Sequence, residues 1–173
     1  MTDAQSDPVP WHLQLTVYGL ALFSTSMFYM AAVIVPLYLV MLKASPFLIG
    51  ISLAARHFLP LLFSIHSGAL MDRLGPRQVM LFFAIIGMIT PMLYPALPWI
   101  GAVLVLQMLS GMADSMGWLG AQTVIGHHMK GRSIYTGRLS FSVRFGHIVA
   151  PPAIGAIWDT LGPWWAFWGL GLW

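Results

Sequence analysis

The segment GALMDRLGPRQ, from Gly68 to Gln78, is a short polar turn between two apolar stretches. The stretch before it covers about 46–71 and the stretch after it about 79–97. A helix that crosses a bilayer needs roughly 20 consecutive, mostly apolar residues, so both stretches are long enough. Gly75 suits the left-handed backbone conformation that often ends a helix. The segment therefore predicts two antiparallel membrane helices joined by a tight, charged turn.

The composition of the whole chain favours a lipid environment. Of its 173 residues, 58% are hydrophobic and only 8% are charged. A soluble domain usually carries about 25% charged residues. So few charges cannot cover a water-facing surface, whereas a surface that faces lipid needs no such cover. We therefore expect an all-α integral membrane protein, with the lipid bilayer as its first partner.

Further apolar stretches give the expected domain organisation. Residues 1–12 form an N-terminal tail and residues 13–173 a membrane domain, with helices at about 13–42, 46–71, 79–97, 99–125, 134–158 and 164–173. The last of these has about half of the roughly 20 residues that a span needs. Either the sequence is a fragment that stops inside a sixth helix, or this segment lies at the membrane interface; the fragment is the favoured interpretation.

The distribution of basic residues predicts the orientation. The turn at 72–78 and the segment after the fourth span lie on the same side of the membrane, and they carry most of the loop cations: Arg73, Arg77, Lys130, Arg132 and Arg138. The opposite loops contain only Lys43. Because basic loops stay in the cytoplasm, we expect a cytoplasmic N-terminus and a multi-pass protein of the plasma or inner cell membrane.

The turn at 68–78 resembles the signature loop of the major facilitator superfamily. Five positions match that signature: Gly68, Asp72, Arg73, Gly75 and Arg77; Pro76 stands where a basic residue is usual. Without the resemblance, a simpler role would explain these residue types: the turn ends a helix and anchors it at the anionic inner leaflet of the membrane. The resemblance implies more: a fold of two six-helix halves, of which this chain is the N-terminal one, and a latch between the halves that breaks and reforms during transport.

Two further comparisons with the superfamily are partial. GHIVAPPAIG, from Gly146 to Gly155, is similar to the bend motif of its antiporters at Gly146, Pro151 and Gly155, while Ala150 and Ile154 replace glycines. Antiport and a simple kinked packing helix both remain open. In the fourth span, many proton-coupled members carry an arginine four residues before a glycine, where this chain has Gln107. The proton-transfer role of that arginine is therefore not carried over.

Charged residues at membrane depth are costly, which makes them candidates for function. Asp114 lies inside the fourth span on the same helical face as Gln107. Arg56 falls in the second span and Arg144 in the fifth, with His147 one turn beyond it. The resemblance implies that these helices border a common cavity. Either Asp114 pairs with an arginine as a structural contact, or the cluster binds an anionic substrate or carries a coupling proton.

The leading functional hypothesis is a secondary carrier that moves a small molecule by alternating access. An acid and two arginines at membrane depth are consistent with proton coupling and with an anionic cargo. The alternative is a non-transporting membrane sensor or assembly subunit on the same fold. No phosphate-binding GxxxxGK[ST] loop, cysteine or clustered metal ligand is present, so we expect no cofactor, no metal site and no enzyme. The basic residues stand singly or in pairs between apolar stretches, so we expect no nucleic-acid partner. A second half, from the same protein or from a second copy, would complete the transport path.

Overall fold

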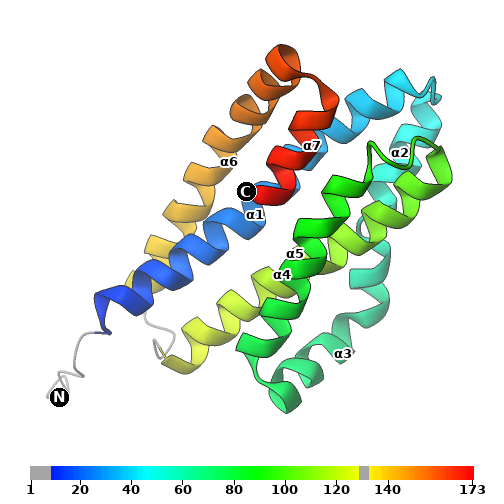
Figure 1. Ribbon diagram of the computed structural model, residues 1–173. Coiled ribbons are helices and arrows are strands. Elements are labelled where there is room, and N and C mark those ends of the chain that lie inside the picture. The colour runs from blue at the N-terminus through cyan, green and yellow to red at the C-terminus, as the bar shows by residue number, and fades with distance from the viewer. Residues whose placement is uncertain (1–8, 129–132) are drawn as a thin grey trace, which may run out of the picture.

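The chain folds into a bundle of membrane-length helices. The computed structural model describes residues 9–128 and 133–173, with backbone only at residues 127 and 128. In these residues the elements are α1 (Trp11–Met41), α2 (Pro46–Ala55), α3 (Phe58–Leu74), α4 (Pro76–Leu93), α5 (Ile100–His128), α6 (Ser133–Leu161) and α7 (Pro163–Leu172). Figure 1 shows α1 beside α6, with α2, α3, α4 and α5 on the other side. The expected loop cations Lys130 and Arg132 lie outside the described residues.

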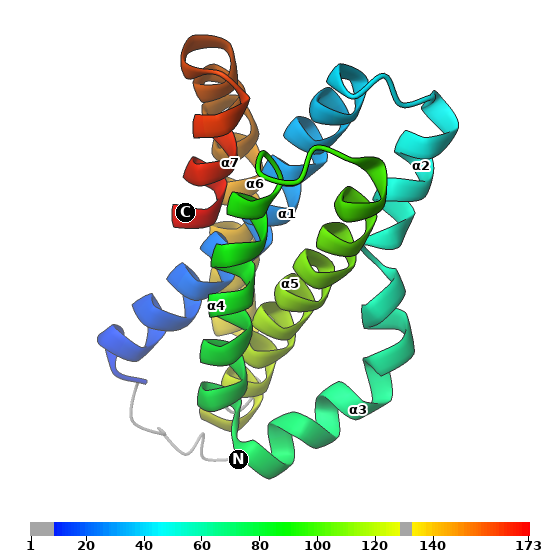
Figure 2. The ribbon, with the colours of Figure 1, turned by 45° about the vertical axis from the view of Figure 1, so that its right-hand side comes forward.

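The second expected span, 46–71, is not one continuous helix. It is divided into α2 and α3 by a break at Arg56 and His57. Proline has no N–H group, and its ring collides with the carbonyl of the residue four positions earlier. For Pro60 that residue is Arg56, so the proline accounts for the position of the break. Figure 2 shows α3 leaving the direction of α2 at this point.

Close packing holds the helices on either side of α1. α1 contacts α5, α6 and α7. Its end toward α2 belongs to a buried cluster in which the ring of Tyr94 stacks on that of Phe167 at 4.8 Å, and Tyr38 donates a hydrogen bond of 2.9 Å to the Tyr94 carbonyl. Between α1 and α6, a Cβ atom at Gly146 would lie 3.2 Å from Leu22 and Ser26, so the glycine permits a close approach. These contacts fix the helices that surround the site.

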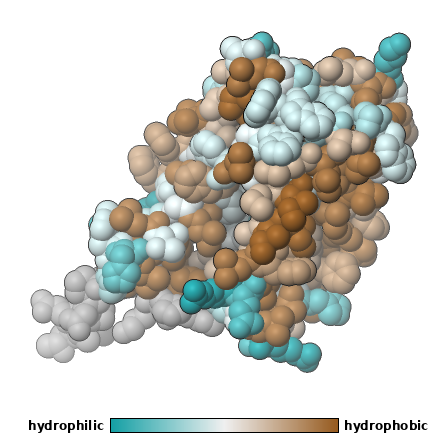
Figure 3. All heavy atoms as spheres, in the orientation of Figure 1, coloured by the Kyte–Doolittle hydropathy of each residue, from teal (hydrophilic) through white to brown (hydrophobic). Residues whose placement is uncertain are grey.

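The outer surface is apolar. Large side chains such as Phe47, Ile65 and Phe141 are mostly exposed, and Figure 3 shows hydrophobic residues covering the flanks of the bundle. Such a surface suits lipid and not water. Among the described residues, four helical segments are long and apolar enough to cross a membrane: Trp11–Met41, Pro46–Leu74, Pro76–Leu93 and Ile100–Gly126. The chain is therefore an all-α, multi-pass membrane protein, as the sequence predicts.

The turns alternate between the two ends of the bundle. The start of α1, the α3–α4 turn and the end of α5 lie at the lower end in Figure 1, and the turns after α1, α4 and α6 lie at the upper end. Arg73 and Arg77 are therefore at one end and Lys43 at the other. The α6 helix is as long as α5 but carries Arg138, Arg144 and His147, which makes it less apolar than the other long helices.

Candidate functional site

A buried ion pair joins the break in the second span to the middle of α5. The Arg56 side chain donates two hydrogen bonds to Oδ2 of Asp114, from Nε at 3.1 Å and from Nη2 at 2.5 Å. Arg56 is 3% exposed. Charges in such surroundings are stable only when they are paired and hydrogen-bonded, and this pair meets both conditions. Of the two arginines expected near Asp114, the structure places Arg56 there.

Two neutral side chains complete the cluster. The third guanidinium nitrogen of Arg56, Nη1, donates a hydrogen bond of 2.7 Å to Oε1 of Gln107, which is fully buried. The Tyr94 hydroxyl donates to the same oxygen at 3.2 Å. The Nε2 atom of Gln107 is buried and makes no hydrogen bond with any described residue. Gln107 thus orients the guanidinium of Arg56, which comes from another helix.

The break at Arg56 and the sequence of α5 explain why these groups meet. The carbonyl group of Arg56, which is freed from helical hydrogen bonding by Pro60, lies directly against Gly111. A Cβ atom at Gly111 would overlap that carbonyl group. Gly111 therefore lets α5 approach the break closely enough for Gln107 and Asp114, one turn to either side, to reach the same guanidinium. This is the local reason for the ion pair.

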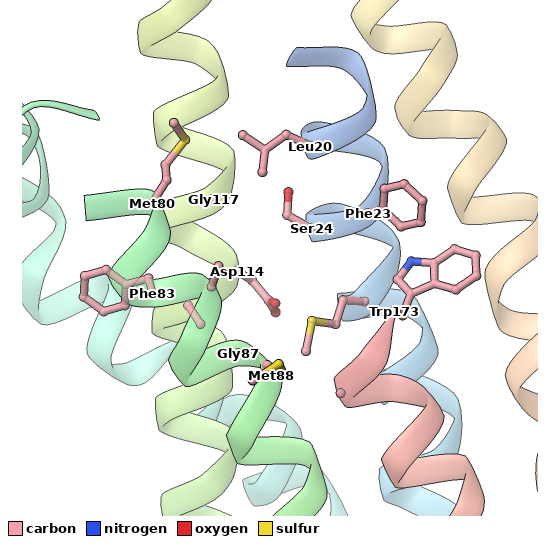
Figure 4. Close-up of a pocket in the computed structure, with 14 residues that line it drawn as sticks. Leu20, Phe23, Ser24, Met80, Phe83, Gly87, Met88, Asp114, Gly117 and Trp173 are labelled. Carbon is pink, nitrogen blue, oxygen red and sulfur yellow. The ribbon is translucent and has the colours of Figure 1, made fainter. Parts of the chain in front are cut away.

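Asp114 lies between two hollows of the bundle. The first is lined by α1, α4, α5 and α7 and has a volume of about 170 Å³. Figure 4 shows Asp114 among mostly apolar side chains of this cavity, with Phe23 and Ser24 on α1 and Met80 and Phe83 on α4. Its lining contains no cation. Arg56 is accordingly the cationic partner of Asp114 within the described part of the chain.

The second hollow is an open pocket of about 290 Å³ between α1, α5 and α6. Asp114 also contributes to this pocket, together with residues from each helix: Thr25, Phe28, Tyr29, Ser115, Trp118 and His147. Phe28 places its ring 5.3 Å from the guanidinium carbon of Arg56. The pocket therefore borders the ion pair directly. Sequence reasoning missed Phe28, Tyr29 and Tyr94 because nothing distinguishes them from the other aromatic residues of an apolar chain.

The predicted meeting of Arg144 and Asp114 is not seen. Arg144 is exposed on α6 and forms no ion pair with Asp114. His147, one turn further along, faces the second pocket, and its ring lies 3.9 Å from that of Tyr29. The structure thus brings together Arg56, Asp114 and Gln107, with His147 on the opposite wall of the pocket. In the described residues, no group of three or more histidine or acidic side chains is arranged to hold a metal ion.

The residues of the signature turn lie at the α3–α4 junction. Gly75 has a φ of 81° and ψ of 144°, and it donates a backbone hydrogen bond of 3.0 Å to Met71 at the end of α3. Asp72, Arg73 and Arg77 are exposed and form no ion pair with another described residue. Gly68 lies inside α3. The turn therefore presents its charged groups outward at one end of the bundle.

Replacement of Gly75 by alanine is expected to destabilise the protein by about 1–2 kcal/mol, because L-residues are strained at this backbone conformation. Gly50→Ala is the matched control, since Gly50 lies in α2 with open space where a Cβ atom would be. Unfolding in mixed detergent micelles, followed by circular dichroism, measures both. Equal stability of the two variants would contradict the strain argument.

The bend motif lies in α6. Pro151 is inside this helix, Gly146 contacts α1, and Gly155 has open space where a side chain would be. Of the two glycines of this motif, only Gly146 is required by the packing of the described residues. The position of Gly155 gives no packing reason for a glycine.

Taken together, the apolar bundle and the ion pair within it define a multi-pass membrane protein with a polar site at membrane depth. Residues 17–173 match the sequence profile of the Major Facilitator Superfamily. The chain belongs to this superfamily of membrane transporters, which confirms the family predicted from the turn at 68–78. No curated protein sequence matches the chain.

Proposed function

We propose that this chain is the N-terminal half of a secondary active transporter that moves a small anion together with a proton by alternating access. The superfamily match supports the transporter class. A second six-helix half, from the same protein or from a second copy, completes the path. The basic turn at 72–78 supports a cytoplasmic location for that end of the bundle, in the plasma or inner cell membrane, and a role for the turn as a latch between the halves.

The observation that carries the proposal is the occupied guanidinium of Arg56. All three of its nitrogens are engaged, two by Asp114 and one by Gln107. An anion that enters this neutral site alone would bring an uncompensated charge into a medium of low dielectric constant, which is costly. An anion that enters with a proton keeps the site neutral. The charge balance of the pair therefore favours coupled binding.

The coupling step follows from this balance. A proton binds to the carboxylate of Asp114 and removes its negative charge. The bonds from Nε and Nη2 to Oδ2 then weaken, and a carboxylate, sulfonate or phosphate group of the cargo accepts them in its place, since arginine binds such groups through two parallel hydrogen bonds. Release on the other side returns the proton to water and the guanidinium to Asp114.

Other titratable groups surround this carboxylate. Arg56 and His57 come from the break between α2 and α3, and Arg56 forms the ion pair with Asp114. Tyr94 reaches the cluster through Gln107 from the end of α4. His147 faces the same pocket from α6. Asp114 is the acid among these groups, and it makes the direct contact with Arg56, so we assign the coupling proton to Asp114.

Transport by the complete gene product in proteoliposomes tests the proposal. Vesicles that contain a pH-sensitive dye report proton entry after the addition of benzenesulfonate or methanesulfonate; both stay singly ionised, so they do not cross as neutral acids and each balances one proton. The wild type is expected to carry protons inward with at least one of these anions. Asp114→Asn is expected to lose this proton movement and to retain anion exchange, because its site is permanently uncharged at position 114.

The control is Asp114→Glu, which keeps an ionisable carboxylate and is expected to keep coupled uptake. Wild-type vesicles that move none of the anions, by uptake or by exchange, would contradict transport and favour the sensor alternative. Undiminished proton movement in Asp114→Asn would contradict the role of Asp114.

A further inference from the structure

The pocket next to the ion pair is walled by aromatic rings. Phe28 and Tyr29 come from α1 and Trp118 from α5. Tyr29 and Trp118 are 41% and 36% exposed, and part of that surface faces the pocket. Aromatic rings bind other rings by offset or edge-on contact, with a preference over saturated groups of the same size. This wall is therefore suited to a flat ring.

The same pocket leads to the charged group. Of its lining residues, Phe28 and Asp114 contact the guanidinium of Arg56. Arg56 itself does not line the pocket, because it is 3% exposed and lies behind Phe28 and Asp114. An anionic group attached to a ring in this pocket therefore reaches the guanidinium only when Asp114 gives up its hydrogen bonds to Arg56.

The far wall offers a hydrogen-bonding group. The Nε2 atom of His147 is buried and makes no hydrogen bond with any described residue. The imidazole ring lies 3.9 Å from the ring of Tyr29, which holds it at the edge of the pocket. The hydroxyl of Ser115 lines the same pocket. A polar substituent on the ring would give Ser115 a partner, whereas the buried Nε2 atom of His147 has no surface open to a ligand.

The pocket is large enough for such a ligand. Its volume is about 290 Å³, whereas a cavity of roughly 150 Å³ accommodates benzene and drug-sized ligands need roughly 300–1,000 Å³. One ring with two substituents fits this volume. One ligand, an aromatic ring with an anionic substituent, is compatible with the volume, the aromatic wall and the nearby arginine.

We infer that the cargo is a small aromatic anion: its carboxylate or sulfonate binds Arg56, and its ring lies among Phe28, Tyr29 and Trp118. This inference rests on the proposed function, since Arg56 accepts the anion only when Asp114 is protonated. The inference adds a preference for aromatic over saturated anions, whereas the proposed function requires only a negative charge on the cargo.

Calorimetric titration of the complete gene product in detergent tests the inference. The titrants are benzoate, its saturated counterpart cyclohexanecarboxylate, and acetate, each measured in two buffers of different ionisation enthalpy so that proton uptake is counted. Benzoate is expected to bind about five- to tenfold more tightly than cyclohexanecarboxylate, with acetate weakest. Each binding anion is expected to take up one proton.

Three variants locate the preference. Trp118→Leu is expected to lower the ratio of the benzoate and cyclohexanecarboxylate affinities, because only Phe28 and Tyr29 remain, whereas Trp118→Phe retains a ring and most of the preference. Phe141→Leu is the control, because Phe141 is 74% exposed on α6 and does not line this pocket. It is expected to leave the ratio unchanged.

The two proposals fail separately. Equal affinities for benzoate and cyclohexanecarboxylate, each with proton uptake, would overturn the aromatic specificity and leave coupled anion binding in place. Anion binding without proton uptake would overturn the coupling and leave the aromatic specificity in place. If none of the three anions binds, the assignment of Arg56 to an aromatic anion is wrong.

Discussion

Asp114→Leu is expected to lower the free energy of unfolding by about 3–5 kcal/mol. The change removes one partner of a buried ion pair and leaves a charge without compensation, which has a cost of this size. Arg56 cannot reach water easily, because its side chain is 4% exposed and that of Asp114 is 12% exposed. Unfolding in mixed detergent micelles, followed by circular dichroism, measures the loss.

The double variant Arg56→Met, Asp114→Leu separates charge from packing. It replaces both charged groups by apolar side chains of similar length, and such replacements of whole ion pairs are often neutral or stabilising. The double variant is therefore expected to recover most of the stability that Asp114→Leu loses, while losing proton-coupled transport. Asp159→Leu is the control, because Asp159 is an exposed acid near the end of α6 and its loss is expected to cost less than about 0.5 kcal/mol. A double variant no more stable than the single one would contradict the charge argument.

Much of the fold follows from the sequence because the lipid environment imposes a simple rule. Apolar stretches of membrane length must form helices, and polar turns must lie between them. The turn at Gly75 is also predictable, but for a different reason: its positive φ angle favours a glycine. The break at Arg56 was also within reach of the sequence. Pro60 inside an apolar stretch marks the carbonyl four residues earlier as unpaired, and the expectation of one continuous helix overlooked it.

The site was predictable only in part. Helical periodicity correctly places Gln107 and Asp114 on one face of α5, because that relation is local. The choice between Arg56 and Arg144 as the partner is not local. It depends on the close approach of α5 to the break, and the sequence does not contain that distance. Tyr94 was missed for a similar reason: it lies at the end of α4 and reaches Gln107 only through the packing of that end against α5.

The approach of α5 to the break gives the second large effect. Gly111→Ala is expected to destabilise the protein by about 3 kcal/mol, at the upper end of the cost of overpacking. The added methyl group would overlap the carbonyl carbon and oxygen of Arg56, which are backbone atoms and cannot turn aside as a side chain can. Either α5 or the break must shift, and the bonds from Arg56 to Gln107 and Asp114 lengthen with it. The same mixed-micelle measurement reports the loss.

Gly19→Ala is the matched control. Gly19 also lies within a membrane helix, α1, but a Cβ atom there would meet nothing within 4 Å. Alanine is a better helix former than glycine, so this variant is expected to be more stable than the wild type by roughly 0.5–1 kcal/mol. The two substitutions are chemically identical, and they differ only in what the methyl group touches. If Gly111→Ala gained stability as Gly19→Ala does, the carbonyl of Arg56 would not be in contact with α5, and the explanation of the ion pair would be wrong.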